Sequence, residues 1–232
     1  MNSKKFQFTV ITVVYNDAIS LEKTIESVLA QKFTNFQYIV IDGNSTDNTK
    51  QILTKFKKDI DIIISEPDEG IYYAMNKALK LSEGKGNIFL NAGDIFSGQI
   101  LSKKLAIPSL IDVRYKNKCD GKFKKKKYTF YKIGMPYCHQ GIVFENKKIM
   151  YNTIYEISSD YDFYIKHRYR NMLKFSKTNG HIQYDNEGIS SKQYKTRDKE
   201  ATIIIKKNFG NFWKFIFLIK IEIKNLLRKI FF

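Results

Sequence analysis

Polar side chains follow four short runs of β-branched and aromatic residues in the first half of the chain. An acid lies at or soon after the end of three of these runs, and the residues concerned are Tyr15, Asn16, Asp42, Glu66, Asp68, Asn91 and Asp94. In an open parallel sheet, ligands bind outside the carboxyl ends of the strands. If the four runs are strands of one sheet, these side chains form one acidic crevice for a polar ligand. The alternative is that Asp42 and Asp68 only cap turns.

The elements that would position this crevice alternate between strand and helix. Helices are predicted after an N-cap at Ser20, around Leu53 and over Ile71–Leu81. Such alternation is typical of a doubly wound, mostly parallel sheet flanked by helices, so the predicted fold class is α/β. The predicted strands are Phe8–Tyr15, Phe36–Asp42, Asp61–Ser65 and Asn87–Asn91.

The pattern is weaker after Asp94. Residues 97–132 are predicted to be irregular, Cys138–Phe144 to return as a strand, and residues 185–200 to form a loop. A helix is expected over Asp160–Leu173, because Ser158 and Ser159 before it are good N-cap residues. Residues 203–232 form a basic, aromatic and apolar tail.

Four motifs make the sequence similar to a known family. VVYN, IDGNSTDNT, SEPDEGIYYAMNKAL and FLNAGD, in this order and spacing, resemble the family 2 glycosyltransferases of the GT-A fold. Within the family they are similar to the bacterial enzymes of capsule, exopolysaccharide and lipopolysaccharide assembly. The resemblance is strong over Phe8–Asp94, and CHQGIVF and SSDYDF extend it to about residue 200.

The resemblance implies a layout for the chain. A GT-A domain would cover residues 1–200, with a Rossmann-like nucleotide-binding half over 1–96 and an acceptor-binding half over 97–200. A basic, amphipathic helical segment would follow over 201–232.

The resemblance also implies a site for a nucleotide-sugar, most often a UDP-sugar. Val13, Tyr15 and Asn16 would line the uracil pocket, with the Tyr15 ring against the base. Asp42 would accept a hydrogen bond from the base imide, since an ionised aspartate only accepts. The residues implied in donor binding are Val13, Tyr15, Asn16, Asp42, Asp68 and Asn91.

Asp94 matches the last acid of the DxD-type motif of the family, which ligates a divalent cation. Departure of a nucleoside diphosphate builds negative charge, which a hard cation such as Mg²⁺ or Mn²⁺ neutralises. The motif here reads Asn91-Ala92-Gly93-Asp94 and carries one acid instead of two. One carboxylate, two phosphate oxygens and waters can still hold Mg²⁺.

The resemblance places the catalytic base in Ser158-Ser159-Asp160-Tyr161-Asp162, where Ser159 replaces the usual first acid. We expect Asp160 to take the proton from the attacking hydroxyl, with Asp162 as the alternative base. Otherwise, Asp160 only caps its helix. His139, in an HQ pair similar to one in this subgroup, is a candidate near the donor sugar or acceptor; otherwise it is a packed residue. A zinc site is excluded because Cys119, Cys138 and His139 lack a second close pair of ligands.

Positive charge is concentrated in two segments. The 232 residues have a formal net charge of +17. Residues 114–132 hold nine basic residues and one acid, and residues 201–232 hold seven basic residues and one acid. The first segment falls where acceptor loops lie in the family, so it could steer a lipid-pyrophosphate acceptor or meet anionic headgroups. The alternative is a solvated lysine surface.

The second segment carries an apolar stripe at helical spacing. Lys214, Lys224, Arg228 and Lys229 lie away from this stripe, as in a basic amphipathic helix on an anionic membrane surface. The alternative is a stripe that packs on the catalytic domain or on a partner subunit. The stripe comprises Phe212, Phe215, Ile216, Ile219, Ile223, Leu226, Leu227 and Ile230, and Phe217, Leu218 and Ile221 fall outside it.

Two cysteines cannot form a disulfide framework, which indicates a reducing compartment. The N-terminus lacks the apolar run of a secretory signal, and the sequence has no run of 18 uncharged apolar residues. These features favour a cytoplasmic protein, peripheral on the inner face of the cytoplasmic membrane.

The expected function is therefore that of a metal-dependent inverting glycosyltransferase, moving a hexosyl or N-acetylhexosaminyl group to a glycan or lipid-linked acceptor. The alternative is a basic nucleic-acid-binding protein without catalysis. Against it, no helix-turn-helix, zinc-finger or RNA-recognition signature is present, so no nucleic-acid partner is expected. A dinucleotide-dependent oxidoreductase and a P-loop NTPase are disfavoured because GxGxxG after the first strand and GxxxxGK[ST] are absent.

Overall fold

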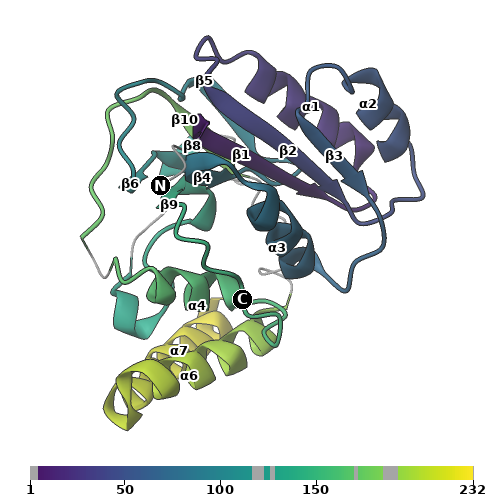
Figure 1. Ribbon diagram of the computed structural model, residues 1–232. Helices are drawn as coiled ribbons and strands as arrows, with labels where there is room; N and C mark the ends of the chain where they lie inside the picture. Colours follow the sequence, from purple (N-terminus) through teal and green to yellow (C-terminus); the bar gives the residue numbers. More distant parts are fainter. Residues whose placement is uncertain (1–4, 117–122, 126–128, 170–171, 185–192, 232) are drawn as a thin grey trace.

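A six-stranded sheet lies at the centre of the protein (Figure 1). The structure is a computed structural model that describes residues 5–116, 123–125, 129–169, 172–184 and 193–231, without the side chains of residues 116, 123, 125 and 227–231. In spatial order the strands are β3 (Ile62–Ser65), β2 (Phe36–Asp42), β1 (Phe6–Val14), β4 (Gly84–Phe89), β9 (Ile142–Glu145) and β6 (Ser109–Leu110).

The first four strands run parallel, which confirms the predicted fold class. Val14 of β1 pairs with Asp42 of β2, and Asp42 pairs with Ser65 of β3, so three carboxyl ends lie in one row. Helices α1 (Ala18–Leu29) and α2 (Thr49–Lys55) pack on one face of the sheet. Helix α3 (Ile71–Leu81) covers the other face, as the alternation requires (Figure 1).

The predicted helix start and one strand end need correction. Helix α1 is capped by Asp17, which accepts a hydrogen bond from the Ser20 amide, whereas Ser20 was expected to be the cap. Strand β4 begins at Gly84 and ends at Phe89, three residues before the predicted start and two before the predicted end. A Cβ at Gly84 would lie 2.4 Å from the backbone of β1, so this glycine marks a close strand approach instead of a turn.

A second, four-stranded sheet occupies much of the region predicted to be irregular. Residues 97–132 were predicted to be irregular, but three strands of this sheet lie wholly or partly in that segment, and the fourth comes from a distant part of the sequence. Strand β10 (Asn179–Tyr184) joins β5 (Ile95–Gln99) and β7 (Val113–Lys116), which precede it by more than 60 residues, and local periodicity does not reveal such pairing. The order is β5, β10, β7 and β8 (Phe123–Lys125).

Two elements that carry candidate site residues are shorter than predicted. The strand expected over Cys138–Phe144 is a 3₁₀ turn η2 (His139–Gly141) followed by β9. The helix expected over Asp160–Leu173 is α4 (Ser159–Lys166). It stops there because Arg168, two residues later, has a left-handed backbone with φ of 58°, which no α-helix contains.

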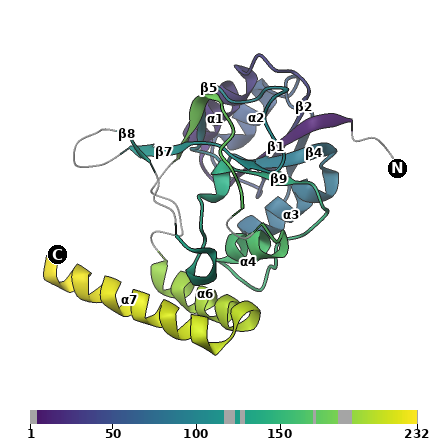
Figure 2. The same ribbon diagram turned by 90° about the vertical axis from the view of Figure 1, so that its left-hand side faces the viewer.

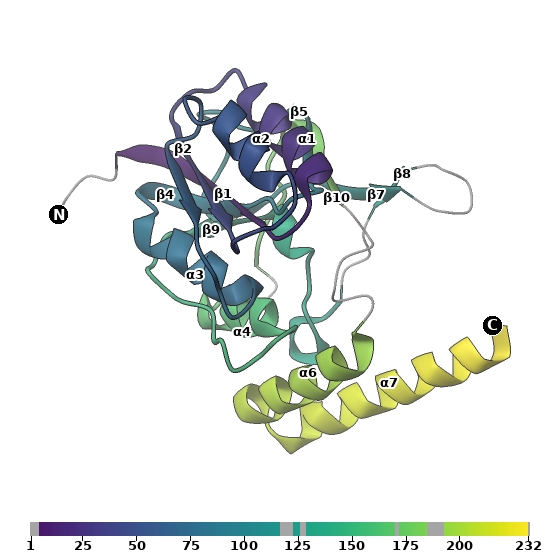
Figure 3. The ribbon, with the colours of Figure 1, turned by 90° about the vertical axis from the view of Figure 1, so that its right-hand side faces the viewer.

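The C-terminal part folds back as two helices, α6 (Tyr194–Phe209) and α7 (Asn211–Phe231) (Figures 2 and 3). Gly210 joins them with φ of 85°, a conformation that favours glycine. The prediction of a loop over 185–200 is wrong for residues 194–200, which are helical. Residues 185–192 of that predicted loop lie outside the described residues. Helix α6 also crosses the boundary expected between residues 200 and 201, so the division into domains stays a prediction.

Helix α7 packs on the domain through residues that do not belong to the predicted stripe. Phe217 is 5% exposed and, with Trp213 and Ile221, packs against Tyr161 and its neighbours. Most of the predicted stripe faces outward, since Phe212, Phe215, Ile219, Ile223 and Leu226 are exposed, whereas Ile216 is half-buried. Leu227 and Ile230 lie outside the described side chains. Within the described part of the chain, no helix is both long and apolar enough to cross a membrane.

Candidate active site

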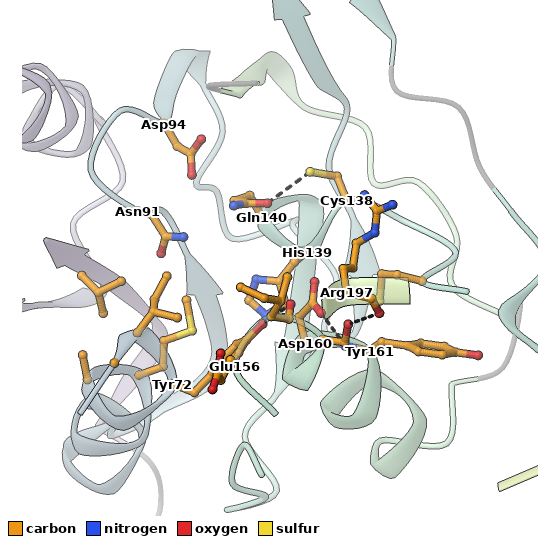
Figure 4. Close-up of a pocket in the computed structure, with 18 of the residues that line it drawn as sticks. Tyr72, Asn91, Asp94, Cys138, His139, Gln140, Glu156, Asp160, Tyr161 and Arg197 are labelled. Atoms are coloured by element: carbon orange, nitrogen blue, oxygen red, sulfur yellow. Dashed lines mark hydrogen bonds between the residues drawn. The ribbon is translucent and has the colours of Figure 1, made fainter. Parts of the chain in front are cut away.

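One open cavity of about 1410 Å³ reaches from the carboxyl end of β1 to the helical pair α6–α7. The structure brings most of the predicted site residues to its wall: Val13, Tyr15, Asn16, Asp68, Asn91, Asp94, His139 and Asp160. Two predicted residues, Asp42 and Asp162, do not line it. Asn91 and Asp94 lie on one side, Arg197 on the other, and His139 and Asp160 between them (Figure 4).

The end of the cavity beside β1 offers a flat apolar surface and a polar loop. The Tyr15 ring is 66% exposed although it follows a buried strand, so it is available to stack on a planar ligand. Asn16 adopts a left-handed φ of 52° and its Oδ1 accepts a hydrogen bond from the Thr46 amide at 2.8 Å. This bond holds the loop after β2 against the end of β1.

Asp42 lies beneath this loop and is fully buried. Its carboxylate accepts hydrogen bonds from the Ser45 amide and hydroxyl, and from the Ser65 hydroxyl at 2.6 Å. Ser45 Oγ in turn accepts from the Asn16 amide at 2.8 Å. Asp42 therefore ties three strand ends together, and its contact with a base stays a prediction.

Asp94 and Asn91 line the cavity, and each side chain carries oxygen atoms. Asp94 is 2% exposed, and Thr24 of α1 fixes its backbone by donating to its carbonyl at 2.9 Å. Asn91 Oδ1 is buried and has no hydrogen-bond partner among the described residues. Carboxylate and amide oxygens are ligands that Mg²⁺ and Mn²⁺ accept, so the pair fits the predicted cation. The described residues contain no cluster of three His, Cys, Asp or Glu that could hold a metal alone.

Asp160 lies in the first turn of α4 and its carboxylate accepts from the Tyr161 amide at 2.7 Å. Burial raises the pKa of Asp160 to about 6, and hydrogen bonds from backbone amides and the charge of Arg197 oppose this rise. A carboxylate with this pKa is ionised at neutral pH and is more basic than an ordinary aspartate. It can therefore accept a proton from a bound hydroxyl.

Asp162, the alternative base, is 4% exposed and forms an ion pair with Lys166 at 2.7 Å, one helical turn away. Asp162 is thus paired with Lys166 and does not line the cavity. A ligand in the cavity would not reach it in this structure.

His139 is packed between the rings of Phe89 and Phe144, and its Nε2 hydrogen-bonds Tyr151 Oη at 2.6 Å. Burial lowers the pKa of His139 to about 3, and His167 acts in the same direction, so the imidazole is neutral at pH 7. His139 thus lines the cavity as an uncharged group.

The sequence and the fold are similar to those of known proteins. A model of the family described as Glycosyl transferase family 2 matches residues 9–210. The chain belongs to this family.

Two curated family 2 relatives of this chain come from bacteria. TuaG of Bacillus subtilis (strain 168), a glycosyltransferase named for teichuronic acid biosynthesis, is 34% identical over 108 residues, which are 45% of this chain and 43% of TuaG. A PGL/p-HBAD biosynthesis glycosyltransferase of Mycobacterium tuberculosis (strain ATCC 25618 / H37Rv) is 28% identical over 178 residues, or 68% of each chain. The alignment thus spans less than half of TuaG.

Solved structures confirm the predicted GT-A fold. TarS of S. aureus has a TM-score of 0.62 at 18% identity, over 87% of this chain and 40% of TarS. The mannosyltransferase PcManGT from Pyrobaculum calidifontis has a TM-score of 0.61 at 16% identity, over 88% and 64% of the two chains. None of these matches supports the alternative of a nucleic-acid-binding protein.

The family motifs do not include the residue that holds the loop before Asp160. Glu200 of α6 is 8% exposed, and its carboxylate accepts hydrogen bonds from three consecutive backbone amides, those of Glu156, Ile157 and Ser158, at 2.7, 3.0 and 2.8 Å. From the other side, Tyr72 of α3 donates to the Ile157 carbonyl at 2.7 Å. Glu200 was missed because it lies 40 positions after Asp160, in a segment whose polar composition predicted a loop.

We expect Glu200→Ala to lower the free energy of unfolding by about 1–3 kcal/mol, because three buried or partly buried amides lose their acceptor. Urea denaturation of the purified variant measures this loss. Glu222→Ala, at an exposed position of α7, is the matched control and should change the value by no more than about 0.5 kcal/mol. Equal stability of both variants would show that the three hydrogen bonds contribute nothing.

Proposed function

We propose that this protein is an inverting glycosyltransferase that moves a sugar from a nucleotide-sugar, with UDP as the preferred nucleotide, to a glycan or lipid-linked acceptor of the bacterial surface. The observation that carries this proposal is the position of Asp160, a carboxylate with a raised pKa, in the same cavity as Tyr15 and Asp94. TuaG is named for teichuronic acid biosynthesis and the mycobacterial relative for PGL/p-HBAD biosynthesis. TarS has been solved with UDP and with UDP-GlcNAc.

In the proposed reaction, the acceptor hydroxyl oxygen attacks the anomeric carbon of the donor sugar. The bond from that carbon to the phosphate oxygen breaks, and its electron pair leaves with the nucleoside diphosphate. Asp160 takes the proton of the hydroxyl as the new bond forms, which requires the ionised carboxylate. Tyr15, with Val13 and Asn16 beside it, holds the base at the far end of the cavity.

Asn91 and Asp94 would hold a divalent cation at the donor diphosphate, as Mg²⁺ or Mn²⁺, and the cation would neutralise the charge of the leaving group. The fold relative PcManGT was solved with GDP-Man and Mn²⁺. The single carboxylate of the motif makes the donor phosphates themselves necessary ligands.

The donor site is tested by thermal unfolding with UDP, GDP, dTDP and CDP, each with and without Mn²⁺. A nucleotide at about 100 times its Kd stabilises the folded state by about 2.7 kcal/mol, which corresponds to a rise in Tm of roughly 5–10 °C for a chain of this length. We expect UDP with Mn²⁺ to give this rise, and Asp94→Ala to reduce it to the value without metal. No rise with any nucleotide would contradict the donor site.

The base is tested through its pKa. Because a raised pKa keeps Asp160 protonated up to about pH 6, we expect kcat/KM to increase with pH through about 6 and then level off. Asp160→Asn should retain nucleotide binding and lower kcat by about 10²- to 10⁴-fold. Release of nucleoside diphosphate, with bacterial membrane extract as the source of acceptor, measures both effects.

Asp162→Asn is the matched control, because it makes the same change two residues away at a side chain that does not line the cavity. Transfer that survives in Asp160→Asn and is lost in Asp162→Asn would move the base to Asp162.

We further propose that the outward face of α7 lies on an anionic membrane surface, which would place the protein at the inner face of the cytoplasmic membrane. Exposed Phe215, Ile219 and Ile223 supply apolar area without packing on the domain. Lys214 and Lys224 of the same helix add attraction to anionic lipids, at about 1 kcal/mol for each basic residue near the surface.

Sedimentation with vesicles of phosphatidylglycerol and phosphatidylcholine tests this surface. The wild-type chain should bind the anionic vesicles, and Phe215→Ser/Ile219→Ser/Ile223→Ser should lose most of this binding. Ile203→Ser, at an apolar residue of α6 that is 50% exposed, is the control and should bind as the wild type does. A stripe covered by a partner subunit would instead give a stable dimer that ignores vesicles.

A further inference from the structure

Helix α1 turns buried polar side chains towards the segment that carries Asp94. Thr24 and Ser27 of the helix, and Gln31 just after it, are at most 9% exposed and follow one another at spacings of three and four residues. Buried polar groups need hydrogen-bond partners. These side chains find theirs on the backbone of residues 93–101, and the partners are the Gly93 amide, the Asp94 carbonyl, the Phe96 amide, the Gly98 carbonyl and the amides of Ile100 and Leu101.

Thr24 holds the backbone on both sides of the Asp94 Cα. Its Oγ1 accepts a hydrogen bond from the Gly93 amide at 3.0 Å and donates to the Asp94 carbonyl at 2.9 Å. The Ser20 carbonyl, one helical turn before Thr24, lies at 3.0 Å and shares the same hydroxyl proton. A hydroxyl has one proton and two lone pairs, so it can accept from one backbone group and donate to another. One fully buried oxygen atom thus fixes the residue that carries the carboxylate.

The turn around Asp94 has little else to fix its direction. The Asp94 amide donates to the Asn91 carbonyl at 2.9 Å, which closes a β-turn over residues 91–94. Gly93, the third residue of this turn, has φ of 97°, a conformation that favours glycine. Glycine has the most freedom of any residue and no side chain to pack. The contact from Thr24 therefore restricts a turn that is intrinsically able to move.

We propose that Thr24 is a positioning residue for the divalent cation of the donor site, because its hydroxyl sets the direction of the Asp94 carboxylate. This inference rests on the proposed function, in which Asn91 and Asp94 hold the cation at the donor diphosphate. Thr24 does not line the cavity and acts on the cation only through Asp94. The motif has a single acid, so no second carboxylate compensates when Asp94 moves.

The test is Thr24→Val, which removes the hydroxyl and keeps the size and branching of the side chain. Thermal unfolding with saturating UDP, over a series of Mn²⁺ concentrations, gives the Mn²⁺ concentration at half of the rise in Tm. We expect this concentration to increase by at least about tenfold in Thr24→Val, because groups that orient a metal ligand typically contribute about 10- to 100-fold to metal affinity. The affinity for UDP without metal should equal that of the wild type. Thr24→Ser keeps the hydroxyl and should retain the wild-type Mn²⁺ concentration.

Thr9→Val is the matched control. Thr9 of β1 is also fully buried, and its Oγ1 also accepts from a glycine amide, that of Gly84, at 2.9 Å. It does not line the cavity. Both valine variants should lower the Tm of the free chain, because each leaves a buried amide without its acceptor. Only Thr24→Val should change the Mn²⁺ concentration at half of the rise.

An unchanged Mn²⁺ concentration in folded Thr24→Val would overturn the role of Thr24, and so would an equal increase in Thr9→Val. Circular dichroism checks that each variant is folded, and Thr24→Ala replaces Thr24→Val if valine unfolds the chain. Failure of the proposed function gives a different result, which appears already in the wild type. A wild-type chain whose Tm does not respond to UDP, or responds equally with and without Mn²⁺, contradicts the donor cation and this inference with it.

Discussion

Three backbone amides that point at one buried carboxylate hold this site together. The segment from Glu156 to Ser158 leads directly to Asp160, and Glu200 binds all three of its amides. Without an acceptor, each buried amide would cost free energy comparable to a lost hydrogen bond. The position of the proposed base therefore depends on α6, a helix that lies outside both sheets. The sheet provides the end of the cavity that Tyr15 and Asp94 line, and α6 positions the segment that leads to the proposed base.

Burial has opposite consequences for two neighbouring groups of this cavity. It raises the pKa of Asp160 towards neutrality, so that the carboxylate is a stronger base and remains ionised at pH 7. It lowers the pKa of His139, which stays uncharged among aromatic rings. Both shifts follow from the cost of charge in a poorly solvated place. The same packing thus keeps the imidazole uncharged and makes the carboxylate a stronger base.

The sequence predicts the parallel half of the fold well, because each strand there pairs with a neighbour that the strand–helix alternation supplies. The second sheet was missed, because β10 joins β5 and β7 across more than 60 residues. Most predicted site residues reach one cavity, since they follow parallel strands or belong to motifs of the family. Asp42 and Asp162 do not, because Ser45 and Ser65 bind the first and Lys166 pairs with the second. The sequence pattern does not indicate that these serines would bind Asp42 or that Lys166 would pair with Asp162. Glu200 shows the same limit, because only tertiary contact reveals its role.

The dependence of the Asp160 loop on Glu200 also orders events during synthesis of the chain. The ribosome completes β1 to β4, with Tyr15, Asn91 and Asp94, long before it adds residue 200. A nascent chain at that stage already contains the strands proposed to hold a nucleotide, while the segment before Asp160 still lacks its acceptor from α6. Competence for transfer would then come last, once α6 docks, so that an unfinished polypeptide could bind a donor without turning it over.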